Sequence, residues 1–292
     1  MSAPAWFAEK LGWKKATAKT AGLCQKAFGL PYGPNLADLS GSSSTLIAGE
    51  AYRILGIPTS RRTDFDIGAL EASRNVGDGE KPKKIPAPGT ALEEGLRRDI
   101  EESLYGRVPE DDDASGRKRW HVTRSGDARQ FAQYEHLAQL QKLFEADSTL
   151  KTTVGRDYQV STDVMVGVPS HWAGTEPYML HAALSSKLTI RSDRVQNIRV
   201  EFGTLVRNRR GRLPHLVVVT AEPLPSRIIS IARGTGEIDA IYHLLYDEID
   251  EALHLLRGQS RHLTSQADGW EEMVAMKRLR PYRELAEVLV SG

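Results

Sequence analysis

Three charged side chains in the second half of the sequence, Asp163, Lys187 and Glu201, are of the types that hydrolyse phosphodiester bonds with the help of a metal ion. Carboxylates hold Mg²⁺ through one or two oxygens and leave water on the ion. The ion lowers the pKa of a bound water, and a lysine ammonium can orient the nucleophile or offset negative charge. By spacing alone, however, a strand lysine followed by a helix glutamate is more often a surface ion pair, and Asp163 could be a strand-end cap.

The elements expected around these residues would bring them together. An alternating, β-branched run at 158–166 predicts a strand that carries Asp163. Residues 180–190, with Lys187, form a second strand candidate, and the nearly continuous apolar run at 213–221 predicts a third that is buried on both faces.

A helix is expected between the second and third strands. Ser192 is its expected N-cap, and Glu201 lies on it. Its apolar stripe, at helical spacing, consists of Val195, Ile198, Phe202 and Leu205. The expected fold is therefore α/β, with a central mixed sheet flanked by helices and no clear linker.

Other helices are expected within residues 1–30, at 45–55, after a cap at Thr90 with apolar residues at 92, 96, 100 and 104, at about 127–145, at about 237–256, and in the tail after residue 258. Residues 73–90 contain glycines, lysines and prolines, which indicate a long surface loop. The acidic segment at 109–118 is also expected to lack regular structure.

Composition excludes several classes of site. Hydrophobic residues make up 40% of the 292 residues and charged ones 26%, as in ordinary globular proteins. The single cysteine, Cys24, excludes an intrachain disulfide and a cysteine metal cluster, and the histidines show no paired ligand spacing. With no run of about eighteen apolar residues and no secretory signal, we expect no membrane span and a cytoplasmic location.

Charge is uneven along the chain, although the formal net charge is only +1. Seven arginines but only two acids lie between Arg191 and Arg212. Such a stretch can dock on a polyanion, because the field within about 8–10 Å governs contact at physiological salt. Charge alone does not separate this interpretation from a solvated helix face.

Four stretches near the candidate site are distinctive: SSKLTIRSDRVQNIRVE at 185–201, LVRNRRGRLPH at 205–215, VVVTAEPLPSR at 217–227 and GTGEID at 234–239. In them the chain resembles the NgoMIV restriction endonuclease family, part of the PD-(D/E)XK nuclease group, whose related members cut DNA around a CCGG core. The likeness is near-continuous from about 180 to 246 and patchier back to Asp38. It implies a single restriction-endonuclease domain over 1–292, with the core at about 90–257, an N-terminal region at 1–89 and a tail at 258–292.

The resemblance implies roles for the candidate residues, position by position. Asp163 and Lys187 match the central active-site pair. Glu201 matches an acid supplied from the helix, which explains why Ser185 stands where other nucleases of the group have their second carboxylate. Glu93 matches a further acid, although a shift of one residue would exchange it with the next glutamate along the chain.

The cofactor implied by the resemblance is Mg²⁺, with two ions per site. Mn²⁺ is expected to substitute for it, and Ca²⁺ to allow binding without cleavage. The implied ligands are Asp163, Glu93, Glu201 and the backbone carbonyl of Ser186. Two features depart from the family: Thr162 rather than proline precedes Asp163, and the connection from Asp163 to Lys187 is much shorter.

Base recognition is implied at two groups of residues. Those that match readers of the CCGG core are Arg191, Asp193 and Arg194, which could otherwise form a surface salt network. Those that match outer base-pair and flanking contacts are Asp38, Ser40 and Arg227. An arginine fork suits guanine O6 and N7, and aspartate can accept from cytosine N4. The implied site is GCCGGC, cut before the first C to leave four-base 5′ overhangs, while the family's minor-groove contact falls near Pro86.

The implied partners are double-stranded DNA, further copies of the chain in a homodimer or homotetramer, and a cognate methyltransferase without a stable complex. A two-fold symmetric dimer also suits a palindromic site on geometric grounds. Two alternatives stay open. One is a DNA-binding protein on the same scaffold that does not cleave, and the other is a nuclease of different specificity, in its outer base pairs or in the kind of nucleic acid.

Overall fold

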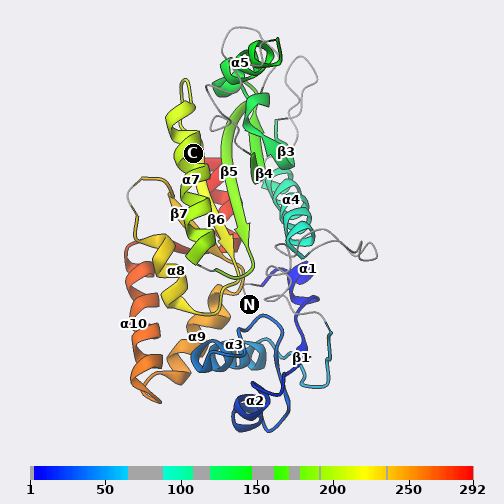
Figure 1. The fold of residues 1–292 in the computed structure, drawn as a ribbon, viewed down its shortest axis with the longest axis vertical. Coiled ribbons are helices and arrows are strands. Elements are labelled where there is room, and N and C mark those ends of the chain that lie inside the picture. Colours follow the sequence, from blue (N-terminus) through cyan, green and yellow to red (C-terminus); the bar gives the residue numbers. More distant parts are fainter. Residues whose placement is uncertain are drawn as a thin grey trace.

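The computed structural model in Figure 1 describes residues 3–64, 88–107, 119–146, 161–170, 178–190, 192–234 and 236–291. Of the loop expected at 73–90, residues 73–87 lie outside the described residues, and Pro86 is among them. The acidic segment at 109–118 lies wholly outside them. Residues 88–90 are helical, so Thr90 is not a cap. Helix α4 (Pro88–Arg107) begins at Pro88, whose fixed φ suits a first helical turn.

The centre of the fold is a six-stranded mixed sheet with the order β3-β4-β5-β6-β7-β8. Its strands are β3 (His121–Asp127), β4 (Ser161–Val168), β5 (Met179–Lys187), β6 (His215–Thr220), β7 (Ala240–His243) and β8 (Leu279–Pro281). β3, β4 and β5 pair antiparallel, whereas β5 to β8 pair parallel. The expected α/β class with a central mixed sheet is confirmed.

Helices cover both faces of this sheet. In Figure 1, α7 (Ser192–Asn208) lies in front of the strands and α11 (Leu285–Ser291) behind them. α4 packs on β3, β4 and β5 and contacts α11. α8 (Pro225–Ala232) contacts both α7 and α10 (Arg261–Ala275), and α5 (Glu135–Ala146) lies at the top of the view.

The N-terminal elements lie in the lower half of Figure 1, with α2 and α3 at the bottom and α1 near the middle. They are α1 (Ala5–Ala8), α2 (Ala21–Phe28), α3 (Ser42–Ile54) and the antiparallel pair β1 (Trp13–Lys15) and β2 (Tyr32–Pro34). α3 packs against α9 (Tyr246–Leu256). A Cβ on Gly49 of α3 would lie 2.3 Å from the Phe28 ring, so the approach of α2 to α3 requires glycine there.

Several of the expected helices were partly wrong. The helix expected at about 127–145 starts only with α5 at Glu135, because β3 ends at Asp127 and two 3₁₀ turns follow. The helix expected at about 237–256 is replaced in its first residues by β7, all four residues of which are buried. A fully buried run has apolar residues at helical and at strand spacing alike, so its periodicity does not distinguish the two. The sequence analysis also missed β1, β2, β3 and β8.

One hydrophobic cluster of buried residues extends from Phe7 to Leu289 and includes side chains of the sheet and of helices on both faces. None of the helices in the described ranges is long and apolar enough to cross a membrane.

Candidate active site

Asp163 lies where the backbone ladder between β4 and β5 ends. The final backbone pair in this direction joins Val164 to Leu184. Beyond it, Asp163 Oδ2 accepts hydrogen bonds from the Ser186 backbone N–H (2.7 Å), the Ser186 hydroxyl (3.2 Å) and Lys187 Nζ (2.8 Å). The Lys187 and Asp163 side chains are 19% and 23% exposed, so their attraction is less screened than on an open surface. The carboxylate therefore holds both strands together at this point.

Glu201 reaches the same place from α7. The expected apolar stripe of this helix is buried: Val195, Ile198, Phe202 and Leu205. Burial raises the pKa of Glu201 to about 6; the Lys187 ammonium opposes this shift, and the Asp163 carboxylate adds to it. The structure thus brings together two carboxylates and an ammonium from β4, β5 and α7.

Glu93 on α4 contacts the strand next to Asp163. The register of β3 and β4 places Ser125 opposite Asp163. The Ser125 hydroxyl donates to Glu93 Oε2 at 3.4 Å, and Arg124 Nη1 lies 3.7 Å from the same oxygen. Ser125 has a φ of 50°, which non-glycine residues rarely adopt, so β3 is distorted at this point. Glu93 is therefore linked to the surroundings of Asp163 through β3.

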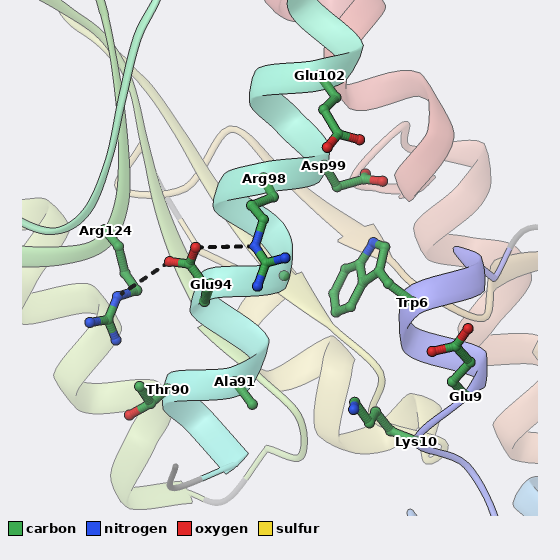
Figure 2. A pocket seen from close by; sticks show the side chains of 11 residues that line it. Trp6, Glu9, Lys10, Thr90, Ala91, Glu94, Arg98, Asp99, Glu102 and Arg124 are labelled. Carbon is green, nitrogen blue, oxygen red and sulfur yellow. Dashed lines mark hydrogen bonds and ion pairs between the residues drawn. The ribbon is translucent and has the colours of Figure 1, made fainter.

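Glu94, the alternative to Glu93, has different neighbours. It accepts hydrogen bonds from Arg97 (2.8 Å) and Arg98 (3.2 Å). Figure 2 shows it between Arg98 and Arg124, at a cavity of about 560 Å³ that α1 and α4 line. Its side chain is 34% exposed, against 12% for Glu93. These arginines already compensate Glu94, so the arrangement favours Glu93 as the acid of the site.

The serines of β5 differ in their contacts. Ser185 is fully buried, and within the described part of the chain its hydroxyl has no hydrogen-bond partner. Ser186 binds Asp163 through both its backbone N–H and its hydroxyl. Ser186 therefore orients the aspartate, while Ser185 contributes a small buried side chain.

The oxygen donors fit a hard divalent cation. Asp163 and Glu201 are carboxylates that repel each other, which a cation would relieve, and Mg²⁺ needs only one or two carboxylates besides water. The Ser186 backbone carbonyl is the further oxygen ligand that the resemblance implies. Across the ranges that the structure describes, no three His, Cys, Asp or Glu side chains converge as a ready metal-binding group. The fit therefore depends on Asp163 and Glu201, and the metal-binding role of Glu93 stays a prediction.

A second cluster joins residues that are far apart in the sequence. Arg227 Nη2 donates to Asp38 Oδ2 at 2.8 Å across a separation of 189 residues. The Ser40 hydroxyl donates to Asp38 Oδ1 at 2.6 Å. Partial burial acts to raise the pKa of Asp38, but the hydrogen bonds from Ser40 and Arg227 outweigh it and hold that pKa at about 2. The three residues expected at the outer base pairs therefore form one charged group.

The expected readers of the CCGG core lie at the start of α7. Arg191 is outside the described residues, and for Asp193 and Arg194 only the backbone is described. Both belong to the first turn of α7, which begins five residues after Lys187. The chain thus passes directly from the candidate catalytic lysine to the expected readers.

The sequence analysis assigned no role to Glu222, a buried acid. Its carboxylate accepts hydrogen bonds from the backbone N–H groups of Ile190 (2.8 Å) and Leu224 (3.0 Å), and Arg227 Nη1 lies 3.5 Å from its Oε2. Burial raises the pKa of Glu222, and the Ile190 N–H and Arg227 oppose this. A charged residue directly after the apolar run 216–221 was the signal that could have revealed it.

Comparisons with known proteins point to restriction enzymes. The family described as NgoMIV restriction enzyme matches residues 114–170 and 169–287. The Type II restriction enzyme NgoMIV of Neisseria gonorrhoeae is 39% identical over 195 residues, which cover 57% of this chain and 66% of that relative. The chain thus matches just under two thirds of the relative's length. The family match includes Asp163, Lys187 and Glu201, whereas Asp38 and Glu93 precede it.

Replacing Asp163 with asparagine should lower the pKa of Glu201 from about 6 towards the usual range of a glutamate. The change removes a like charge and frees the Lys187 ammonium to interact with Glu201, and both effects favour the ionised form. Titration of the Glu201 carboxyl carbon by NMR measures the shift. The control, Glu94→Gln, should leave this pKa unchanged, because arginines of its own helix surround Glu94. An unchanged or higher pKa in Asp163→Asn would contradict the coupling.

Proposed function

The chain belongs to the NgoMIV restriction enzyme family, and we propose that it is a type II restriction endonuclease that hydrolyses double-stranded DNA. The observation that carries the proposal is the Asp163–Lys187 pair at 2.8 Å with the half-buried Glu201 beside it, whose pKa is raised to about 6. Two carboxylates can bind a cation, and the ammonium beside them can face a phosphate. A solvated surface pair would not have a second, half-buried acid with a raised pKa beside it.

In the proposed mechanism, Asp163, Glu201 and the Ser186 carbonyl would hold Mg²⁺, because hard cations take oxygen ligands. When bound, Mg²⁺ lowers the pKa of a coordinated water and neutralises charge on the phosphate. Lys187, held by Asp163, donates to the attacking water or to a phosphate oxygen and offsets the developing charge. The oxygen of the water forms a bond to phosphorus as the bond between phosphorus and the 3′ oxygen breaks. The water loses one proton to solvent and the 3′ oxygen takes one up, so a 5′ phosphate and a 3′ hydroxyl remain.

Asp163→Ala should abolish cleavage of a supercoiled plasmid that carries GCCGGC in Mg²⁺, with a loss of at least about a thousandfold. The substitution removes the acceptor that holds Lys187 and the proposed metal ligand, whereas the base-reading residues are unchanged. Specific binding, measured in Ca²⁺, should therefore be largely retained.

The control for this experiment is Glu94→Gln, which changes an acid outside the proposed site and should still cut. Cleavage by Asp163→Ala would refute the role of Asp163. A wild-type protein that binds GCCGGC tightly in Ca²⁺ but does not cut in Mg²⁺ would refute the endonuclease and favour a DNA-binding protein on the same scaffold.

We further propose GCCGGC as the target, with Arg191, Asp193 and Arg194 on the CCGG core. For the outer pair, the support is the Arg227–Asp38 pair at 2.8 Å. Guanine offers two acceptors to a guanidinium and its paired cytosine offers one donor to a carboxylate. Neighbouring arginine and aspartate side chains therefore match the two halves of one G·C pair.

Asp38→Ala should reduce the preference for an outer G·C pair by about 1–3 kcal/mol. The alanine removes the acceptor for cytosine N4 and one of the groups that orient Arg227. Competition binding in Ca²⁺ between GCCGGC and ACCGGT duplexes measures the ratio of affinities. An equal loss on both duplexes would instead assign Asp38 to general folding or docking.

We propose that the chain acts as a homodimer or a pair of dimers, and that a methyltransferase of the same specificity protects the host DNA. A two-fold dimer presents the same residues to both halves of a palindrome. Sedimentation velocity with and without a GCCGGC duplex tests the assembly. A monomer that stays monomeric on its specific duplex would contradict it.

A further inference from the structure

Glu222 is a fully buried acid at the edge of the sheet where parallel strands end. Its carboxylate is 0% exposed, and it follows β6 by two residues. The register pairs Lys187, the last residue of β5, with Thr220, the last residue of β6. Glu222 therefore lies in the connection next to the segment that leads from Lys187 to α7.

The Glu222 carboxylate joins two connections. Oε2 accepts from the backbone N–H of Ile190, which directly precedes Arg191 in the sequence. Oε1 accepts from the backbone N–H of Leu224, which directly precedes α8. One side chain thus fixes the backbone before the expected core readers and the start of the helix that carries Arg227.

The negative charge of Glu222 is compensated by Arg227. A buried carboxylate is costly unless it is paired and hydrogen-bonded. Arg227 Nη1 lies 3.5 Å from Glu222 Oε2, while its Nη2 donates to Asp38. The side chains of Glu222, Arg227 and Asp38 are 0%, 31% and 40% exposed. This series runs from the core to the surface, so the guanidinium is anchored from inside and open on its outer side.

The anchored guanidinium keeps donors for a ligand. A guanidinium has five N–H donors in a fixed plane, and the contacts to Glu222 and Asp38 use two of them. Donors remain for the two acceptors of a guanine edge. Without Glu222, a flexible arginine side chain would have to be ordered on binding, which lowers affinity and specificity.

We propose that Glu222 is a positioning residue for recognition of the outer base pair, and that it acts by holding the Arg227 guanidinium in the plane that reads guanine. The inference rests on the proposed GCCGGC specificity. Glu222 touches neither DNA nor the reacting atoms, and its effect passes through Arg227.

The test compares Glu222→Gln with the wild-type protein by the ratio of Kd values for GCCGGC and ACCGGT duplexes in Ca²⁺. Glutamine keeps the volume and one acceptor oxygen but lacks the charge that holds Arg227. We expect the ratio to fall by about tenfold, with far-UV circular dichroism unchanged. Glu222→Ala should reduce the ratio at least as much as Glu222→Gln does. Glu222→Asp, which keeps the charge, should give a ratio between those of Glu222→Gln and the wild-type protein.

A double-mutant cycle tests whether the effect passes through Arg227. In an Arg227→Ala background, Glu222→Gln should change the ratio by less than about twofold, because the effects of residues that act as a unit are not additive. The structural control is Asp239→Ala, which removes a carboxylate that accepts the Leu216 backbone N–H at 2.8 Å and pairs with His215, near the opposite end of β6. It should lower the midpoint of urea unfolding and leave the ratio unchanged.

The outcomes separate the two proposals. A wild-type protein without preference for GCCGGC over ACCGGT overturns the proposed specificity, and the role of Glu222 with it. A wild-type preference that Glu222→Gln retains in full overturns the role of Glu222 alone. The role of Glu222 is also overturned if Glu222→Gln weakens binding to both duplexes equally, or if its full effect on the ratio persists in the Arg227→Ala background. Because the ratio is measured by binding, it does not depend on cleavage.

Discussion

The candidate active site depends on one acceptor, the Asp163 carboxylate, at the point where β4 and β5 cease to pair through their backbones. There Oδ2 accepts a hydrogen bond from the Ser186 backbone N–H, as a backbone carbonyl would in a regular ladder. It also accepts one from the Lys187 ammonium. The same charge adds to the raised pKa of Glu201. The Asp163 side chain thus joins β4 to β5 where their backbone pairing ends, orients Lys187 and helps to raise the pKa of Glu201.

Glu222 has a comparable role at the end of the neighbouring strand, β6. Both acids accept a backbone N–H from the chain around the end of β5 and both pair with a cation, but Asp163 is partly exposed and Glu222 is fully buried. The difference in exposure matches a difference in task. An acid that meets substrate must be reachable, whereas an acid that only orients an arginine is better shielded from water.

The topology explains why the proposed catalytic residues and the proposed recognition residues lie close together. β5 and β6 run parallel, so the connections that follow them leave the sheet at the same edge. One connection leads from Lys187 into α7, and the other leads through Glu222 into α8. The N-terminal region adds Asp38 to this edge through its contact with Arg227. Any change in the packing of α3 against α9 would therefore move the expected outer-base group relative to the catalytic one.

The sequence alone determined the helix that carries Glu201, because an apolar stripe at helical spacing is a local signal. It also predicted the residues of the site, the mixed sheet and the strands of Asp163 and Lys187. Only the tertiary structure decided that residues 240–243 form a strand, since this depends on hydrogen bonds to β6 and β8. The Arg227–Asp38 pair and the contacts of Glu222 were likewise decided by folding. They join residues distant in the chain, and the cost of burying Glu222 can be judged only once its partners are in place.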